Sequence, residues 1–232
     1  QAVADNLAAD IVEVRGSHLW TGVLGTKYLL PVLTQYGHGD LAYTVATQTD
    51  FPSWGRWFAE GSTSLWEHWG DYRSRNHYFL GGTIDDWFYE DLAGVTLLEP
   101  GYRTFAVSPQ VLGELTRVAA ATTTPYGEIR TVWEHSEDVF TLNLTVPVGA
   151  TAEVSIPVDG TYLIREGGVP AASAPGVTYT GTEDDATTYR VGSGTYAFEA
   201  AAINDAIGAI DALDAALQGY IDTGAVAGPI AS

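Results

Sequence analysis

The hydrophobic pattern of the chain changes once, near Pro100-Gly101, and this change constrains the fold more than any other feature. Before it, apolar residues recur at helical spacing between Gly- and Pro-containing loops, which predicts helical hairpins. After it, apolar and polar residues alternate in short runs, which predicts the strands of an antiparallel β-sandwich. The sequence therefore predicts a multidomain, α-then-β protein with a helical region over 1–101, a β-sandwich over 102–200 and an Ala-rich helical tail over 201–232.

Helices are predicted in the first region at 1–15, Thr26–Tyr36, Leu41–Gln48, Ser53–Glu60 and Tyr78–Leu92. Apolar stripes are expected on the first two helices, formed by Val3, Leu7, Ile11 and Val14 and by Tyr28, Leu29, Leu33 and Tyr36. Gly16 is expected to cap the first helix and Asp40 to be the N-cap of the third. Pro31 fits only the first turn of a helix, so the second helix is expected to begin close to it.

Strands are predicted at Thr104–Ser108, Leu115–Ala119, Gly127–Glu134, Val139–Val146, Thr151–Pro157, Thr161–Ile164, Val177–Thr180 and Gly194–Glu199. In the third of these, Ile129, Thr131 and Trp133 are expected to lie on one face. From Ala200 to Ala216 the spacing is helical again, which predicts the start of the tail.

Composition narrows the classes of partner. The chain has 232 residues, a formal net charge of −19 and a pI near 4.3, which argues against nucleic acid or an anionic membrane as a partner. It contains no Cys, so a disulfide or thiolate chemistry is excluded, and no apolar run is long enough to span a bilayer. No cofactor or metal is expected, since no His-x-x-x-His spacing occurs. Because Met is absent, including at position 1, the chain is expected to be a piece of a longer polypeptide.

One stretch, 60–78, combines aromatic rings with carboxylates and imidazoles, which suits a polar cleft better than a dry core. A sugar presents an apolar C–H face to a ring and hydroxyls to charged or amide groups. The candidate sugar-contacting residues are Trp54, Trp66, Trp69, Asn76 and His77, and Glu67 belongs to the same candidate cleft. Two simpler readings stay open: the Trp side chains pack a core, and Glu67 forms an ion pair with Arg73 or Arg75.

The order of several short segments resembles the bacterial α-L-rhamnosidases, glycoside hydrolase family 78. The matching segments are Thr21–Leu30, Asp40–Tyr43, Pro52–Trp54, Gly61–Glu67 with Trp69, Asn76-His77 and Leu92–Gly94, followed by Pro100-Gly101, Pro109-Gln110, Pro125–Gly127 and Trp133. The resemblance implies the last helical hairpins of an (α/α)6 barrel followed by a β-sandwich. Thr63-Ser64 departs from the family's Thr-Thr, and the loop between Trp69 and Asn76 is short.

The resemblance also implies an activity: hydrolysis of terminal α-L-rhamnosides with inversion, with Glu67 as the general base and His77 in the rhamnose pocket. The family's general acid lies in the earlier half of the barrel, so the chain alone is expected not to catalyse. The expected partners are the carbohydrate substrate and either the N-terminal remainder of the enzyme or a second copy that covers the open barrel. Secretion is expected by family analogy. The alternative function is a non-catalytic carbohydrate-binding or structural fragment.

Overall fold

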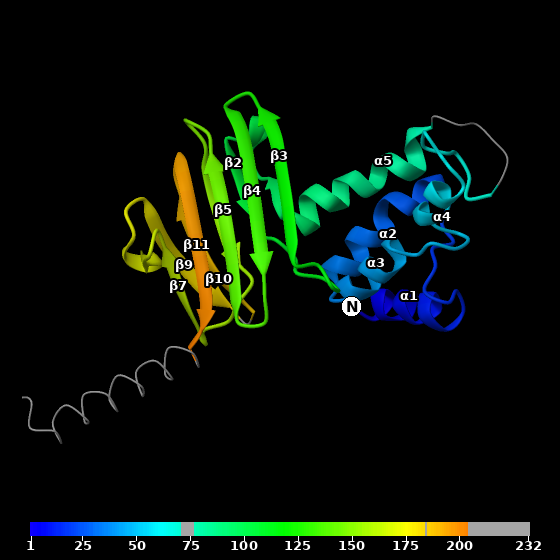
Figure 1. Ribbon diagram of the computed structural model, residues 1–232, viewed down its shortest axis with the longest axis horizontal. Helices are drawn as coiled ribbons and strands as arrows, with labels where there is room; N and C mark the ends of the chain where they lie inside the picture. Colours follow the sequence, from blue (N-terminus) through cyan, green and yellow to red (C-terminus); the bar gives the residue numbers. More distant parts are fainter. Residues whose placement is uncertain (71–76, 184, 204–232) are drawn as a thin grey trace, which may run out of the picture.

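The computed structural model describes residues 1–70, 77–183 and 185–203, and it places helices at one end of the molecule and two sheets at the other (Figure 1). The helices are α1 (Ala2–Glu13), α2 (Val23–Gln35), α3 (Gly39–Ala46), α4 (Trp54–Ala59) and α5 (Tyr78–Trp87), which continues as a π-turn over Phe88–Leu92. Each of the five helices predicted in the first region is confirmed. Ser53 is the N-cap of α4, and its hydroxyl accepts a hydrogen bond from the Arg56 backbone N–H at 3.0 Å.

Some helical details differ from the predictions. Pro31 lies deep inside α2, where its ring leaves the Lys27 carbonyl without its usual helical donor. Asp40 lies in the first turn of α3 rather than at its N-cap, which is His38, because its carboxylate instead accepts from the Gly113 N–H at 2.8 Å. The expected stripes are also partly wrong, because the side chains exposed on them include Val3, Val14, Tyr28 and Tyr36.

The helices bury one shared core. Its central members are Leu19, Leu29, Leu30, Leu33, Val45, Trp54, Trp57, Leu80 and Trp87. Helix α5 packs on α2, where the Trp87 indole N–H donates to the Thr34 hydroxyl at 2.8 Å. This contact fixes the direction of α5, the helix that links the helical region to the sheets (Figure 1).

The sheets form the predicted sandwich. The first has the order β1-β2-β6-β10-β9, with β1 (Val95–Leu97), β2 (Thr104–Val107), β6 (Thr151–Ile156), β10 (Ala186–Val191) and β9 (Val177–Glu183). The second has the order β3-β4-β5-β11-β7-β8, with β3 (Arg117–Thr124), β4 (Gly127–His135), β5 (Val139–Val146), β11 (Gly194–Ala202), β7 (Tyr162–Glu166) and β8 (Val169–Pro170). All neighbouring pairs are antiparallel except β2 and β6, which are parallel. Ile129, Thr131 and Trp133 share one face of β4, and the structure shows that this face is buried.

Several predictions in this region are wrong. β1, β8 and β10 are absent from the predicted strands, and of these β10 lies inside the first sheet between β6 and β9. Its Thr-rich sequence hides the alternation of buried Thr187, Tyr189 and Val191. Ala200–Ala202 belong to β11 and not to a helix, because β11 pairs with both β5 and β7 and its Ala200 is fully buried. The remainder of the predicted tail lies outside the described residues.

The two regions are joined through a packed junction. The Trp133 indole N–H, in the sandwich core, donates to the Leu92 carbonyl at the end of the π-turn at 2.7 Å. From the other side, Leu112 reaches into the helical core and lies so close to Gly39 that a Cβ there would be 2.5 Å from the leucine. These contacts hold α5 in a defined position against the sheets.

Candidate active site

The loop that carries Trp66, Glu67 and Trp69 follows α4 and is tied to three different elements. The Ser62 N–H donates to the Trp57 carbonyl at 2.9 Å, and the His77 N–H donates to the Leu65 carbonyl at 2.8 Å. The Trp69 indole N–H donates to the Thr21 carbonyl at 2.8 Å. The loop that bears Glu67 is therefore held against α4, against the start of α5 and against the segment before α2.

Four Trp side chains, two from α4 and two from this loop, pack on one another. Trp57 is stacked on Trp69 at 5.0 Å between ring centroids and lies 5.9 Å from Trp66, while Trp54 meets Trp69 edge-on at 5.2 Å. The Trp54 indole N–H donates to the Leu80 carbonyl at 2.8 Å. Trp54, Trp57 and Trp66 are buried, so their rings support the loop; Trp69 is only half-buried. Direct sugar contact by Trp54, Trp66 and Trp69 stays a prediction.

Glu67 is half-buried on the loop, between the buried Trp66 and the exposed His68. Within the described part of the chain it forms no ion pair or hydrogen bond. None of the described residues therefore prevents its carboxylate from binding a ligand or a water molecule. Arg73, Arg75 and Asn76 lie outside the described residues, so the alternative of an ion pair with either arginine stays open.

His77 occupies the N-cap position of α5. Its Nδ1 is buried and has no hydrogen-bond partner among the described residues, and its ring lies 4.8 Å from that of Phe79 and 5.8 Å from that of Tyr78. Buried polar atoms normally have partners, so this orphaned nitrogen marks His77 as a residue whose polar contacts are incomplete. The Leu65–His77 backbone hydrogen bond places Leu65, two residues before Glu67, at the N-terminal end of α5.

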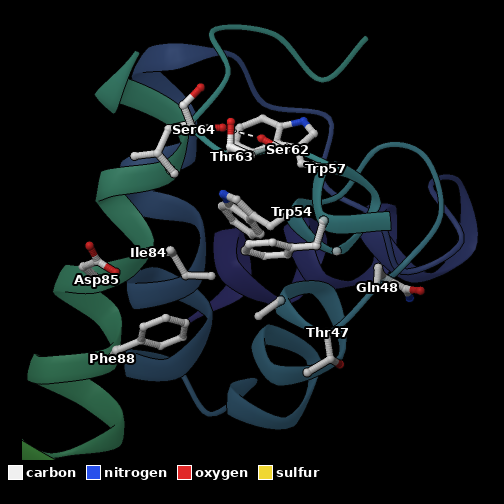
Figure 2. Close-up of a pocket in the computed structure, with 15 residues that line it drawn as sticks. Thr47, Gln48, Trp54, Trp57, Ser62, Thr63, Ser64, Ile84, Asp85 and Phe88 are labelled. Atoms are coloured by element: carbon white, nitrogen blue, oxygen red, sulfur yellow. Dashed lines mark hydrogen bonds between the residues drawn. The ribbon is translucent and has the colours of Figure 1, made fainter. Parts of the chain in front are cut away.

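The structure also contains a feature that the sequence did not reveal: a pocket of about 650 Å³ between α3, α4 and α5 (Figure 2). Its lining includes Trp54, Trp57, Phe58, Leu65, Ile84 and Phe88, with Ser62, Thr63, Ser64 and Asp85 as polar members. Glu67, Trp66, Trp69 and His77 do not line it. The only signal for it in the sequence is the spacing of Gly81, Ile84, Asp85 and Phe88, which places them on one face of α5.

Two other carboxylates of the helical region, Glu60 and Asp91, do not fit the role of a second catalytic group beside Glu67. Glu60 is engaged with the Arg56 guanidinium, with 2.6 Å between Nε and Oε1. Burial raises the pKa of Asp91 to about 6, helped by the nearby charge of Glu90. However, Asp91 lies in the π-turn, and fourteen residues of helix place it about 20 Å along the axis from His77. An inverting pair needs about 6.5–9.5 Å, so Asp91 is too distant to act with Glu67.

No group of three or more His, Asp or Glu side chains that could hold a metal ion occurs in residues 1–70, 77–183 and 185–203. Over the same residues, no helix is both long and apolar enough to cross a membrane.

Comparisons with known proteins agree with this architecture. Residues 1–92 match the model of the bacterial alpha-L-rhamnosidase 6 hairpin glycosidase domain, and residues 94–169 match that of the bacterial alpha-L-rhamnosidase C-terminal domain. The chain belongs to the bacterial α-L-rhamnosidase family. It is 36% identical over 209 residues to an α-L-rhamnosidase of Streptomyces avermitilis, covering 85% of this chain and 19% of that protein. A Formosa agariphila α-L-rhamnosidase is 35% identical over 160 residues, which cover 64% of this chain and 17% of the relative.

Solved structures of this family share the fold. The α-L-rhamnosidase from Dictyoglumus thermophilum has a TM-score of 0.78 at 33% identity, covering 85% of this chain and 23% of that one. The Streptomyces avermitilis enzyme, solved in complex with L-rhamnose, has a TM-score of 0.76 at 36% identity, covering 85% of this chain and 19% of that one. The chain thus spans about a fifth of the length of the relatives it matches.

Proposed function

We propose that this chain provides the general base and part of the sugar pocket of an inverting α-L-rhamnosidase, which releases terminal α-L-rhamnose from rhamnosides. The observation that carries the proposal is Glu67, a half-buried carboxylate without a partner among the described residues, held on a tethered loop that contributes to a Trp cluster. Support also comes from the relatives, which are α-L-rhamnosidases and include one solved with L-rhamnose.

In this mechanism the Glu67 carboxylate takes a proton from a water molecule as the water attacks the anomeric carbon. The attack comes from the face opposite the leaving oxygen, which inverts the configuration. A second carboxylic acid protonates the leaving oxygen, and the two carboxyl groups stand about 6.5–9.5 Å apart. The bulky rings of Trp66 and Trp69 beside Glu67 limit the access of bulk water to the reacting atoms.

The sugar would be oriented by groups at the start of α5. His77 is anchored through its backbone to Leu65, and its imidazole would exchange hydrogen bonds with rhamnose hydroxyls. Asn76 would do the same with its amide, and Trp54, Trp66 and Trp69 would form the apolar wall. Such contacts accelerate the reaction only to the extent that they strengthen in the transition state.

The general acid is assigned to a part of a longer polypeptide beyond these 232 residues. The relatives are about five times as long, and the described carboxylates at α4 and the π-turn are engaged or too distant. The N-terminal remainder of the enzyme is thus proposed as the partner of this chain. Secretion stays an expectation from the family.

The test is Glu67→Gln in the polypeptide extended at its N-terminal side, assayed on an aryl α-L-rhamnoside. Loss of the base should lower kcat by about 10²–10⁴-fold and leave KM nearly unchanged. Glu60→Gln is the matched control, because Glu60 pairs with Arg56 and should leave turnover unchanged. Wild-type kcat in the Glu67→Gln enzyme would disprove the assignment.

The same N-terminally extended polypeptide distinguishes this proposal from the alternative, a carbohydrate-binding role without catalysis. The 232-residue chain alone should show no turnover whether or not it binds L-rhamnose. If the extended polypeptide binds L-rhamnose but hydrolyses no rhamnoside, the binding function takes first place.

A further inference from the structure

Two aromatic side chains are exposed on loops close to the loop that bears Glu67. Trp20, on the loop of residues 14–22, is 59% exposed, and Phe51, on the loop of residues 47–53, is 43% exposed. Their rings meet edge-on with 6.3 Å between centroids, and we call the pair the Trp20–Phe51 platform. Exposed apolar side chains on helices, such as Leu24, lie where further helices can pack. The platform lies on loops between helices, so it calls for a different explanation.

The two loops are tied to each other, so the platform has a fixed shape. The Gln48 side-chain amide donates to the Ser17 carbonyl at 3.1 Å, and His18 Nε2 lies 2.7 Å from Asp50 Oδ1. The edge-on ring contact adds a third link between the same loops. Because the three contacts follow one another along both loops, they hold the two rings in one arrangement.

The backbone of Trp20 is anchored on both sides. Leu19 is fully buried in the helical core, and the Thr21 carbonyl accepts the hydrogen bond from the Trp69 indole N–H at 2.8 Å. Trp69 follows Glu67 by two residues, so the loop that bears Trp20 contacts the loop that bears the proposed base. A ring that is already held in place loses little conformational freedom when a ligand stacks on it, which favours binding.

Paired charges lie beside the platform. The guanidinium carbon of Arg15 lies 5.8 Å from the centroid of the Trp20 ring, and its Nε lies 3.1 Å from an Asp10 carboxylate oxygen. His18 has its own carboxylate partner, Asp50. Although the whole chain has a formal net charge of −19, this rim therefore offers hydrogen-bond donors and acceptors in balance. Such a rim suits a neutral polar ligand better than an ion.

A pyranose fits the combination of an open ring and a balanced rim. Its C–H groups form an apolar face that packs on an indole, and its hydroxyls both donate and accept hydrogen bonds. Arg15 donates, whereas Asp10 and Asp50 accept, so the hydroxyls at the edge of a sugar would find both kinds of partner. A wholly aromatic ligand would use the ring but leave these polar groups without a role.

We propose that the Trp20–Phe51 platform binds a sugar residue of the glycan that carries the terminal rhamnose. One face of this pyranose would lie on the Trp20 indole, with Phe51 at its edge. Its hydroxyls would exchange hydrogen bonds with Arg15, Asp10 and Asp50. The platform would thus give a preference for rhamnose attached to another sugar over rhamnose attached to a small aryl group. The inference deepens the proposed function, on which it rests for the identity of the terminal sugar.

The first test compares two ligands by titration calorimetry on the N-terminally extended polypeptide. The ligands are L-rhamnose and a disaccharide of α-L-rhamnose thio-linked to glucose, which resists hydrolysis. Trp20→Ala should raise the Kd of the disaccharide about three- to tenfold, through loss of one stacking contact, and leave the Kd of L-rhamnose unchanged. Trp20→Phe, which keeps a ring, should recover part of the affinity. Tyr179→Ala, at a 49% exposed ring on β9, is the control and should change neither Kd.

Three results would overturn the proposal. An unchanged disaccharide Kd in Trp20→Ala would show that no sugar lies on this ring. An equal rise of both Kd values would show that the substitution only disturbs the rhamnose pocket. A wild-type protein that binds the disaccharide no more tightly than L-rhamnose would show that the second sugar has no site of its own.

A second measurement tests whether the platform is open in the extended polypeptide. In hydroxyl-radical footprinting with peptide mass spectrometry, Trp20 should be oxidised readily in the free protein. With saturating disaccharide it should be oxidised about half as fast, because a stacked sugar covers one of the two ring faces. L-Rhamnose alone should leave the rate unchanged, and Tyr179 should react equally fast in every sample.

Resistance of Trp20 to oxidation in the free extended polypeptide would show that other parts of the protein cover the platform, and it would contradict the proposal. Both measurements report binding rather than turnover. Their outcome is therefore independent of the effect of Glu67→Gln on kcat, so failure of the platform and failure of the proposed base can be told apart.

Discussion

The helical region and the β-sandwich of this chain differ in how completely they bury their apolar residues. Among the described residues, the sandwich encloses a core of 23 buried residues, including Phe105, Trp133, Phe140 and Phe198. The helical region buries a smaller core and leaves many large apolar side chains exposed, among them Val3, Trp20, Leu24, Tyr28, Phe58, Tyr78 and Phe88. The sandwich therefore buries its large apolar side chains within itself, whereas the helical region leaves apolar surfaces that further helices can cover.

The largest expected effect comes from breaking the closed unit. Trp133 is fully buried in the sandwich, so Trp133→Ala should lower the free energy of unfolding by about 3–5 kcal/mol, measured by urea denaturation with circular dichroism. Trp133→Phe keeps most of the ring but loses the hydrogen bond to the Leu92 carbonyl, and should cost about 1–3 kcal/mol. If Trp133→Ala lowered the free energy of unfolding no more than Trp133→Phe does, burial of the Trp133 ring would not be a main source of the stability of the sandwich.

A second prediction sharpens the comparison at the junction between the two regions. Gly94 has φ of +78°, and a Cβ there would lie 2.3 Å from the Pro109 nitrogen and the Ser108 carbonyl carbon. Gly94→Ala should therefore cost at least about 1–3 kcal/mol and separate the unfolding of the helices from that of the sandwich. Gly37→Ala is the control, because Gly37 has a similar φ of +84° but open space around it, so the substitution strains the backbone without a steric clash. Differential scanning calorimetry should show one transition for Gly37→Ala and two for Gly94→Ala.

The smallest effect concerns a carboxyl group on the junction side of α5. The pKa of Asp91 is raised from 3.8 to about 6 by burial and by Glu90. The folded state therefore binds the Asp91 proton more tightly than the unfolded state does. The resulting contribution to the free energy of unfolding is fully present below pH 3.8 and is lost as pH rises through about 6. Because Asp91 is only partly buried, solvent screening limits the loss to about 1 kcal/mol.

Asp91→Asn should remove this pH dependence. Its free energy of unfolding, from urea titrations, should match wild type near pH 4 and exceed it by about 1 kcal/mol at pH 7. Asp86→Asn, at an exposed carboxyl on the same helix, is the control. If the free energy of unfolding of the Asp91→Asn protein changed between pH 4 and pH 7 as much as that of wild type, Asp91 would not be the cause of the pH dependence.

Sequence reasoning found the parts of the candidate site that lie close together along the chain. Glu67 and His77 were singled out from one stretch of residues, and the structure tethers both ends of the described part of that loop to α4 and α5. The pocket beside it was missed because its walls come from α3, α4 and α5, and the sequence does not state which helix faces pack together. The burial of Trp54 and Trp57 likewise depends on rings from separate segments meeting in space.

By itself, the sequence determined the type and order of most elements, because helical and strand periodicities are local properties that survive in any tertiary context. It gave the extent of β5 correctly, but it predicted the change from helices to strands near Pro100-Gly101, whereas the first strand, β1, already begins at Val95. Only the tertiary structure decided that Pro31 sits inside α2, that Ala200–Ala202 form a strand, and that β10 lies within a sheet. It also decided the parallel pairing of β2 with β6. The physical reason is that strand pairing and helix burial are set by partners distant in sequence, whose packing and hydrogen bonds outweigh local propensity.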